Sequence, residues 1–159
     1  MTKILIFGNS GSGKSTLAAR TSQRQGALHL DLDNFAWENT SPPNRRPVSD
    51  SLAQINAAIS GHNQWIIEGC YSDLLAPLSN QADQIIFLNL PVEDCLSNAK
   101  NRPWEPHKYA SKADQDANLP MLLNWIADYE LRDDTFSKAH HRALYDSFSG
   151  QKLELTENQ

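Results

Sequence analysis

The segment GNSGSGKST, residues 8–16, combines glycines, a lysine and hydroxyl side chains at a spacing that suits phosphate binding. It satisfies G-x-x-x-x-G-K-[ST] from Gly8 to Ser15, after an apolar run and before a helix-forming one. Backbone N–H groups that no side chain obstructs can converge on phosphate oxygens, and Lys14 adds a cation. A glycine-rich turn with a solvated lysine is the alternative. The flanking context favours a phosphate-binding loop, for which ATP is the expected ligand.

Within this loop, different atoms have different expected tasks. The helix that begins near Lys14 contributes its positive N-terminal end, and Ser15 offers a hydroxyl to the Mg²⁺ that accompanies ATP. Thr16 follows in the same turn, within reach of the α-phosphate. The residues expected to contact the nucleotide are therefore Gly8, Asn9, Ser10, Gly11, Ser12, Gly13, Lys14, Ser15 and Thr16.

Carboxylates follow two further apolar runs. Asp31 and Asp33 lie at the end of ALHLDLD, and two residues apart on a strand they would point to the same face, at the carboxyl edge where ligands of open α/β sheets bind. Glu68 ends WII just before Gly69, where it could hold Mg²⁺ or its water. The alternative for all three acids is that they cap turns or loops.

The chain also carries a pair of arginines and a tryptophan beside the acidic run. Arg45 and Arg46 lie in a proline-rich loop over residues 38–50, where they could clamp a phosphate or carboxylate of an acceptor, unless they are merely solvated. Trp37, which precedes this loop, and Trp104 in a second loop are candidates for stacking on a substrate, whereas Trp65 and Trp125 fall on core-facing patterns.

These side chains need a scaffold, and the sequence predicts alternating strands and helices. Buried strands are expected at residues 3–7, 27–33, 64–69 and 84–91, with a weaker one at 151–155. Helices are expected at 14–25, at 49–60 with Ser49 or Asp50 as N-cap and Gly61 as the stop, and over 118–149 as one long helix or two that meet near Asp133–Asp134. Strands separated by helices imply a parallel α/β sheet.

The polar segment 98–120 lacks apolar periodicity and is long for a loop, so we expect a lid over the site. The 159-residue chain suffices for a single domain over residues 1–159. Its net charge of −5 argues against nucleic-acid and membrane partners. Cys70 and Cys95 fit no metal or disulfide spacing and no apolar run is long enough to span a membrane, so we expect a cytoplasmic protein, monomer or homodimer.

Several classes of phosphate-loop protein are excluded, because the sequence has neither D-x-x-G with N-K-x-D, typical of GTPases, nor LSGGQ, typical of ABC proteins. The order of GNSGSGKST, HLDLDNFAW, WIIEGCYS and IIFLNLP resembles adenylate kinase-like P-loop kinases, above all the small bacterial DNA topology modulation proteins. NWIADYELR at 124–132 extends this resemblance over most of the chain, and DLD is also similar to the D-x-D of shikimate and gluconate kinases.

This resemblance implies a three-layer αβα P-loop fold with strand order 2-3-1-4-5 and a small lid. It assigns Asp31 to the Mg²⁺ shell and Asp33 to the acceptor hydroxyl. It matches Arg102 to a lid arginine and Arg132 to one on the following helix, where cations would face the transferred phosphoryl group; ordinary solvated arginines are the alternative. Departures from the family pattern at Glu68, Asn89 and Cys70 leave the acceptor open.

Two functional hypotheses follow. In the first, the protein is an ATP- and Mg²⁺-dependent kinase that transfers the γ-phosphoryl group to a nucleotide, a nucleoside or a small hydroxylated metabolite. Lys14, Asp33, Arg102 and Arg132 would then be catalytic, and Asp33, Trp37, Arg45, Arg46 and Glu68 would contact the acceptor. In the second, it is a nucleotide-binding regulatory protein with slow ATPase activity that acts through a partner.

Overall fold

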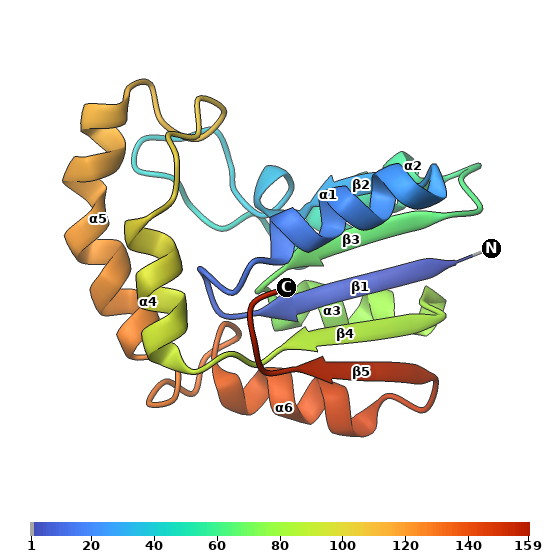
Figure 1. Cartoon of the computed structure of the whole chain (residues 1–159). Helices are drawn as coiled ribbons and strands as arrows, with labels where there is room; N and C mark the ends of the chain where they lie inside the picture. The colour runs from blue at the N-terminus through green and yellow to red at the C-terminus, as the bar shows by residue number, and fades with distance from the viewer. Residues whose placement is uncertain (1) are drawn as a thin grey trace.

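The computed structural model describes residues 2–159, in which a five-stranded parallel sheet forms the centre (Figure 1). The strands are β1 (Lys3–Gly8), β2 (Leu28–Asp31), β3 (Trp65–Gly69), β4 (Gln84–Leu88) and β5 (Gln151–Leu155). Their order is β2-β3-β1-β4-β5, and each neighbouring pair is parallel. The predicted fold class and strand order are confirmed.

The central strand β1 explains why the sheet forms where the sequence predicts it. Ile4 to Phe7 are all buried, because β1 lies between β3 and β4 and is covered on both faces. A strand buried on both faces must be apolar throughout, as ILIF is. The chain leaves this strand at Gly8, so the phosphate-binding loop starts at the carboxyl edge of the sheet.

Helices cover both faces of the sheet, which gives three layers (Figure 1). One face packs against α2 (Val48–Ile59), α3 (Ser72–Leu78) and α6 (Lys138–Ser147). The opposite face packs against α1 (Lys14–Gln25), α4 (Val92–Lys100) and α5 (Lys112–Ala127). The segment 118–149 thus contains the end of α5 and all of α6, which confirms the two-helix alternative.

Some predicted boundaries are wrong. The second strand ends at Asp31 and not at residue 33, because Leu32–Asn34 form a 3-10 turn, η1. Helix α2 begins at Val48 after Pro47, so neither Ser49 nor Asp50 is its N-cap. Proline is suited to this place because its fixed φ prepares the first turn.

The segment 98–120 is less irregular than expected. Its first residues complete α4, which ends at Lys100, and its last residues belong to α5, which begins at Lys112 with the Ser111 hydroxyl as N-cap. Only residues 101–111 are loop, and we call them the 101–111 segment. The absence of apolar periodicity arose because the first turns of α5 are polar and largely exposed, so they show no buried stripe.

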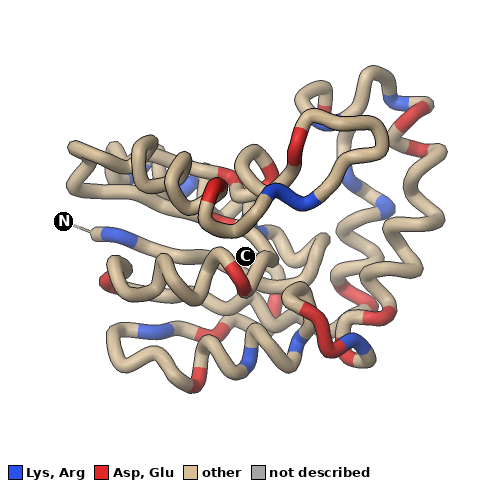
Figure 2. Tube along the Cα trace, turned by 180° about the vertical axis from the view of Figure 1, so that it is seen from behind, with Lys and Arg blue, Asp and Glu red and all other residues tan. Residues whose placement is uncertain are grey.

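Among residues 2–159, no helix is both long and apolar enough to cross a membrane. Acidic and basic residues are interspersed over the described chain (Figure 2). Cys70 and Cys95 are both free thiols.

Candidate functional site

The phosphate-binding loop depends on two glycines for different reasons. Gly11 has a φ of 79°, and a Cβ there would lie 2.5 Å from the backbone oxygen of Cys95 in α4. Gly13 has a φ of 91° with open space around it, and it is the residue that precedes α1. Gly11 thus lets the loop approach α4, whereas Gly13 supplies the left-handed backbone that starts the helix.

The N-terminal turn of α1 faces the loop, and no acidic side chain in this turn competes with a bound anion for its N–H groups. Gly13 provides no side-chain cap, and the first turn contains no acidic residue. Its N–H groups, together with the positive end of the helix, therefore suit an anion. The ammonium of Lys14 lies inside the loop, where its Nζ donates to the backbone oxygen of Asn9 at 2.8 Å.

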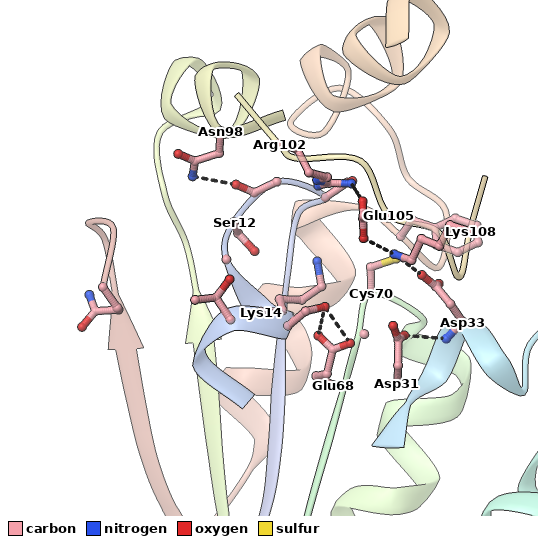
Figure 3. A pocket seen from close by; sticks show the side chains of 18 of the residues that line it. Ser12, Lys14, Asp31, Asp33, Glu68, Cys70, Asn98, Arg102, Glu105 and Lys108 are labelled. Carbon is pink, nitrogen blue, oxygen red and sulfur yellow. Dashed lines mark hydrogen bonds and ion pairs between the residues drawn. The ribbon is translucent and has the colours of Figure 1, made fainter. Parts of the chain in front are cut away.

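A cavity of about 790 Å³ joins this loop to the carboxyl ends of β2 and β3 and to the 101–111 segment (Figure 3). Most of the predicted site residues line it: Ser10, Gly11, Ser12, Gly13, Lys14, Ser15, Thr16, Asp31, Asp33, Trp37, Glu68 and Arg102. The remaining predicted residues do not line it: Gly8, Asn9, Arg45, Arg46 and Arg132. Lysine, hydroxyl and carboxylate groups thus come together as the sequence suggests.

Glu68 occupies the most enclosed position of these acids. It is 1% exposed, and the Ser15 hydroxyl donates to its carboxylate, with oxygen distances of 3.0 and 3.1 Å. Asp31 is its neighbour across β2 and β3. Burial, and then the charge of Asp31, raise the pKa of Glu68 to about 8, against the opposing effect of Lys14. Near neutral pH this carboxyl therefore carries a proton for much of the time.

Ser15, Asp31 and Glu68 bring three oxygen-bearing side chains together beside the phosphate-binding loop. Magnesium prefers oxygen ligands, and it usually keeps several waters while it binds one or two carboxylates and the phosphates of its nucleotide. No group of three metal-binding His, Cys, Asp or Glu side chains occurs within residues 2–159. A hydroxyl and two carboxylates beside a phosphate loop fit an ion that arrives with its nucleotide.

Asp33 reaches the cavity differently from the predicted arrangement. Because β2 ends at Asp31, Asp33 lies in η1, and the Asp31 carboxylate accepts from the Asp33 backbone N–H at 2.9 Å. Asp31 therefore caps this turn, which was the alternative reading. Asp33 itself accepts from the Tyr71 hydroxyl and from Lys108 Nζ at 3.2 Å. Burial tends to raise the pKa of Asp33, but Lys108, Tyr71 and Lys14 outweigh it and hold that pKa below its usual value.

The 101–111 segment contributes a chain of ion pairs across the cavity (Figure 3). Arg102 Nη1 lies 3.2 Å from Glu105 Oε1, and Lys108 Nζ lies 3.6 Å from Glu105 Oε2. Because Lys108 also pairs with Asp33, the segment is tied to the end of η1. Glu105 and Lys108 belong to the site, although the sequence analysis gave neither a role there.

The other predicted arginines have protein partners. Arg45 donates to both carboxylate oxygens of Asp73 at 3.1 Å, and its guanidinium lies over the Tyr71 ring. Arg46 donates to the Trp37 backbone oxygen at 3.1 Å. Arg132 stacks on the Trp125 ring, 4.2 Å from its centre. These arginines therefore support neighbouring residues in the structure as it stands.

A row of aromatic side chains also lines the cavity. Trp37 contacts Tyr71, Tyr71 contacts Phe136, and Phe136 contacts Trp125, in edge-to-face pairs with ring centres 6.5, 5.2 and 5.5 Å apart. We call these residues the aromatic row. Of the two predicted stacking residues, Trp37 belongs to the row and Trp104 does not line the cavity, whereas Trp125 was expected to pack in the core. Tyr71 follows the end of β3, and that position was the one sequence signal that could have found it.

Behind the cavity, His141 links α6 to the end of β3 through a hydrogen bond. It is fully buried, with Nε2 2.8 Å from the backbone oxygen of Cys70 and Nδ1 2.6 Å from the Tyr129 hydroxyl. A carbonyl only accepts, so the proton belongs on Nε2 and the Tyr129 hydroxyl donates to Nδ1. Burial lowers the pKa of His141 to about 4, so it is neutral at physiological pH.

Comparisons with known proteins complete the description. A family model described as an AAA domain matches residues 4–118. The uncharacterized protein YqaC of Bacillus subtilis (strain 168) is 28% identical over 150 residues, which cover 90% of this chain and 79% of that protein.

Two solved structures are similar to the chain. Shikimate kinase from Acinetobacter baumannii in complex with shikimate is 18% identical with a TM-score of 0.46, covering 91% of each chain. Deoxyadenosine kinase from M. mycoides with bound dATP is 12% identical with a TM-score of 0.50, covering 97% of this chain and 90% of that one. At this level of identity the second likeness speaks to the fold alone.

Proposed function

The chain belongs to the AAA domain family and has the fold of small P-loop kinases, and from this premise we propose that it transfers the γ-phosphoryl group of ATP to a small acceptor, with Mg²⁺. One observation carries the proposal. The phosphate-binding group around Lys14 and the ionised carboxylate of Asp33 line the same cavity. Asp33 is separate from the carboxylates of Asp31 and Glu68 that are assigned to Mg²⁺, so it is available to an acceptor.

The nucleotide end uses the loop and the helix end. Backbone N–H groups of the loop and the first turn of α1 would bind the phosphates, and Lys14 would exchange the Asn9 oxygen for phosphate oxygen. Mg²⁺ supplies positive charge against the phosphates, and Ser15, Asp31 and Glu68 are the side chains that would hold it. Because that task needs an ionised Glu68, ion binding competes with the proton on this carboxyl.

The acceptor end uses Asp33. Its side chain is 41% exposed, and each of its oxygens retains a lone pair after it accepts from Tyr71 or Lys108. An acceptor hydroxyl could therefore donate to Asp33 while its oxygen faces the γ-phosphorus. As the new oxygen–phosphorus bond forms, the bond to the bridging oxygen of ADP breaks and the hydroxyl proton passes to Asp33.

The 101–111 segment would close the cavity. Arg102 lines it from this segment and would place positive charge against the transferred group, in exchange for its pairing with Glu105. Closure also keeps water from competing with the acceptor. Arg132 would act through Trp125, on which it stacks, unless closure brings it into the cavity.

An acceptor panel tests this function. ADP release would be followed with Mg²⁺ and ATP in the presence of nucleosides, nucleoside monophosphates, shikimate or gluconate, with the phosphorylated product identified by mass spectrometry. We expect ADP release that depends on one class of acceptor and that the Lys14→Ala variant lacks. ADP release that is the same with and without every acceptor would contradict transfer and favour the regulatory protein with slow ATPase activity.

A further inference from the structure

The composition of the acceptor end narrows the acceptor class. The rings of the aromatic row line the cavity from Trp37, which follows η1 in the chain, to Trp125 of α5. They provide an apolar surface there. Trp37 is 38% exposed, whereas Tyr71 is almost wholly buried and joins Trp37 through a 2.9 Å hydrogen bond from the indole N–H. The row is thus anchored in the protein but open to a ligand at Trp37.

Two arginines contact the rings of the row without lining the cavity. The guanidinium of Arg45 lies 4.9 Å from the Tyr71 ring centre and 5.7 Å from that of Phe136, and Asp73 holds it there. Arg132 lies against the Trp125 ring in the same manner. Neither arginine lines the cavity. They stiffen the rings through cation–π contacts and do not offer positive charge to a ligand on the cavity side.

The basic side chains that do face the acceptor end are already paired. Lys108 lies between Asp33 and Glu105, and Arg102 pairs with Glu105. The other basic residues that line the cavity within the described chain are Lys14 and Arg20, which belong to the nucleotide end. Arg102 is assigned to the transferred phosphoryl group, so only Lys108 is left for a phosphate or carboxylate on the acceptor, and Lys108 is held between Asp33 and Glu105. Such an anion would also approach these two carboxylates against like charge.

We propose that the acceptor is an uncharged molecule with a planar aromatic ring and a free hydroxyl, which is the chemistry of a nucleoside. The inference rests on the proposed function and names the substrate class of its site. The base would lie against the aromatic row at Trp37 and Phe136, and the sugar hydroxyl would donate to Asp33. Stacking on aromatic rings binds every base because each has a π face.

Trp37 and an exposed apolar residue far from the site provide a pair of variants. Trp37 is 38% exposed and lines the cavity, whereas Leu153 of β5 is 43% exposed and does not line it. Steady-state kinetics would compare Trp37→Leu, Trp37→Phe and Leu153→Ala with adenosine, guanosine, cytidine and thymidine as acceptors. Phe136→Leu is the second variant of the row, in case Trp37→Leu does not fold, as judged by circular dichroism.

The expected result is selective for the acceptor. Nucleosides should be better acceptors than their 5′-monophosphates, shikimate or gluconate. Trp37→Leu should raise the nucleoside KM about tenfold and leave the ATP KM unchanged, because one stacking contact is lost. Trp37→Phe should restore most of the affinity, and Leu153→Ala should match the parent.

Three results would overturn the inferred acceptor class. They can be distinguished from the result that would refute phosphoryl transfer itself. Transfer to shikimate, gluconate or a monophosphate, but not to nucleosides, would refute the acceptor class while the kinase function stands. A raised ATP KM in Trp37→Leu would show that the row holds the base of ATP instead. Equal nucleoside KM values in Trp37→Leu and Leu153→Ala would remove the row from the site. Calorimetric nucleoside binding that Trp37→Leu weakens, without any ADP release, would support the ligand class and refute transfer.

Discussion

The phosphate-binding loop and the aromatic row form two ends of one cavity, but the chain builds them differently. The loop consists of consecutive residues, 8–16, whose backbone conformation depends on nearby glycines. The row takes Trp37, Tyr71, Trp125 and Phe136 from distant segments, and only the packing of α5, α3 and the loops brings them together. A locally encoded site can be recognised from sequence, whereas an assembled one requires the fold.

The largest expected effect belongs to the loop. Lys14→Ala should lower turnover about a thousandfold, because it removes a cation placed against the phosphates. The parent should gain about 2.7 kcal/mol of stability at an ATP concentration of 100 times Kd, and the variant should gain almost none. Thermal melts with and without Mg²⁺ and ATP measure this. Lys100→Ala, at the exposed end of α4, is the control. An unchanged ATP response in Lys14→Ala would break the assignment of the loop.

The pH dependence of the unfolding free energy offers a second contrast between the two ends. Glu68 at the nucleotide end and His141 behind the acceptor end should change this free energy in opposite directions as the pH rises. The folded pKa of Glu68 is about 8 and its ordinary value is 4.5, so the folded state holds a proton that the unfolded state has lost. The unfolding free energy should therefore fall as pH rises from 4.5, by about 3 kcal/mol at pH 7. Glu68→Gln should abolish this fall in urea titrations. A slope that persists in Glu68→Gln would mean that another group carries it.

His141, behind the acceptor end, should act in the opposite direction. Its folded pKa is about 4 and its ordinary value is 6.5, so between these values the unfolded state binds more protons. The unfolding free energy should therefore fall by about 3 kcal/mol as pH drops from 6.5 to 4. Denaturation of His141→Gln over this range should lack that loss. His140 on the exposed side of α6 supplies the control variant, His140→Gln, which should keep the parent's response.

The same distinction between local and assembled features explains which parts of the fold could be predicted from the sequence. Strands such as ILIF and helix α1 with its Gly26 stop were predictable, because their signals lie within the element. The end of β2 at Asp31 was not, since Asp31 and Asp33 fit an extended pattern equally well until the Asp31 side chain caps the turn.

At the site, the same reasoning placed Lys14, Ser15 and Glu68 beside one another, because loop and strand ends share one edge of a parallel sheet. It could not foresee that Lys108 would pair with Asp33, or that Arg45 would lie behind Tyr71 with Asp73. A long basic side chain can reach many partners, and its choice depends on tertiary contacts that no local spacing encodes.

Arg102 lies between the two ends and should have an intermediate effect. Arg102→Ala should lower turnover about tenfold while the ATP KM changes little, because the side chain is expected to act on the moving phosphoryl group after closure. Lys112→Ala is a suitable control, since Lys112 pairs only with Asp116 on the surface of α5. Equal turnover in Arg102→Ala and the parent would remove Arg102 from the mechanism.

The smallest effect should come from substitution of Arg45. This variant distinguishes two roles for the Arg45 side chain, which are to support the neighbouring Tyr71 ring or to bind an acceptor phosphate as the sequence suggests. Arg45→Met should cost about 1 kcal/mol of stability, because the partly exposed pair with Asp73 and the contact with Tyr71 are lost. Arg46→Met, which loses one exposed hydrogen bond to Trp37, should cost less. Chemical denaturation and acceptor kinetics together decide between the roles. Unchanged stability in Arg45→Met with a higher KM for phosphorylated acceptors alone would mean that Arg45 turns into the cavity to bind them, and the acceptor end would then be a charged site.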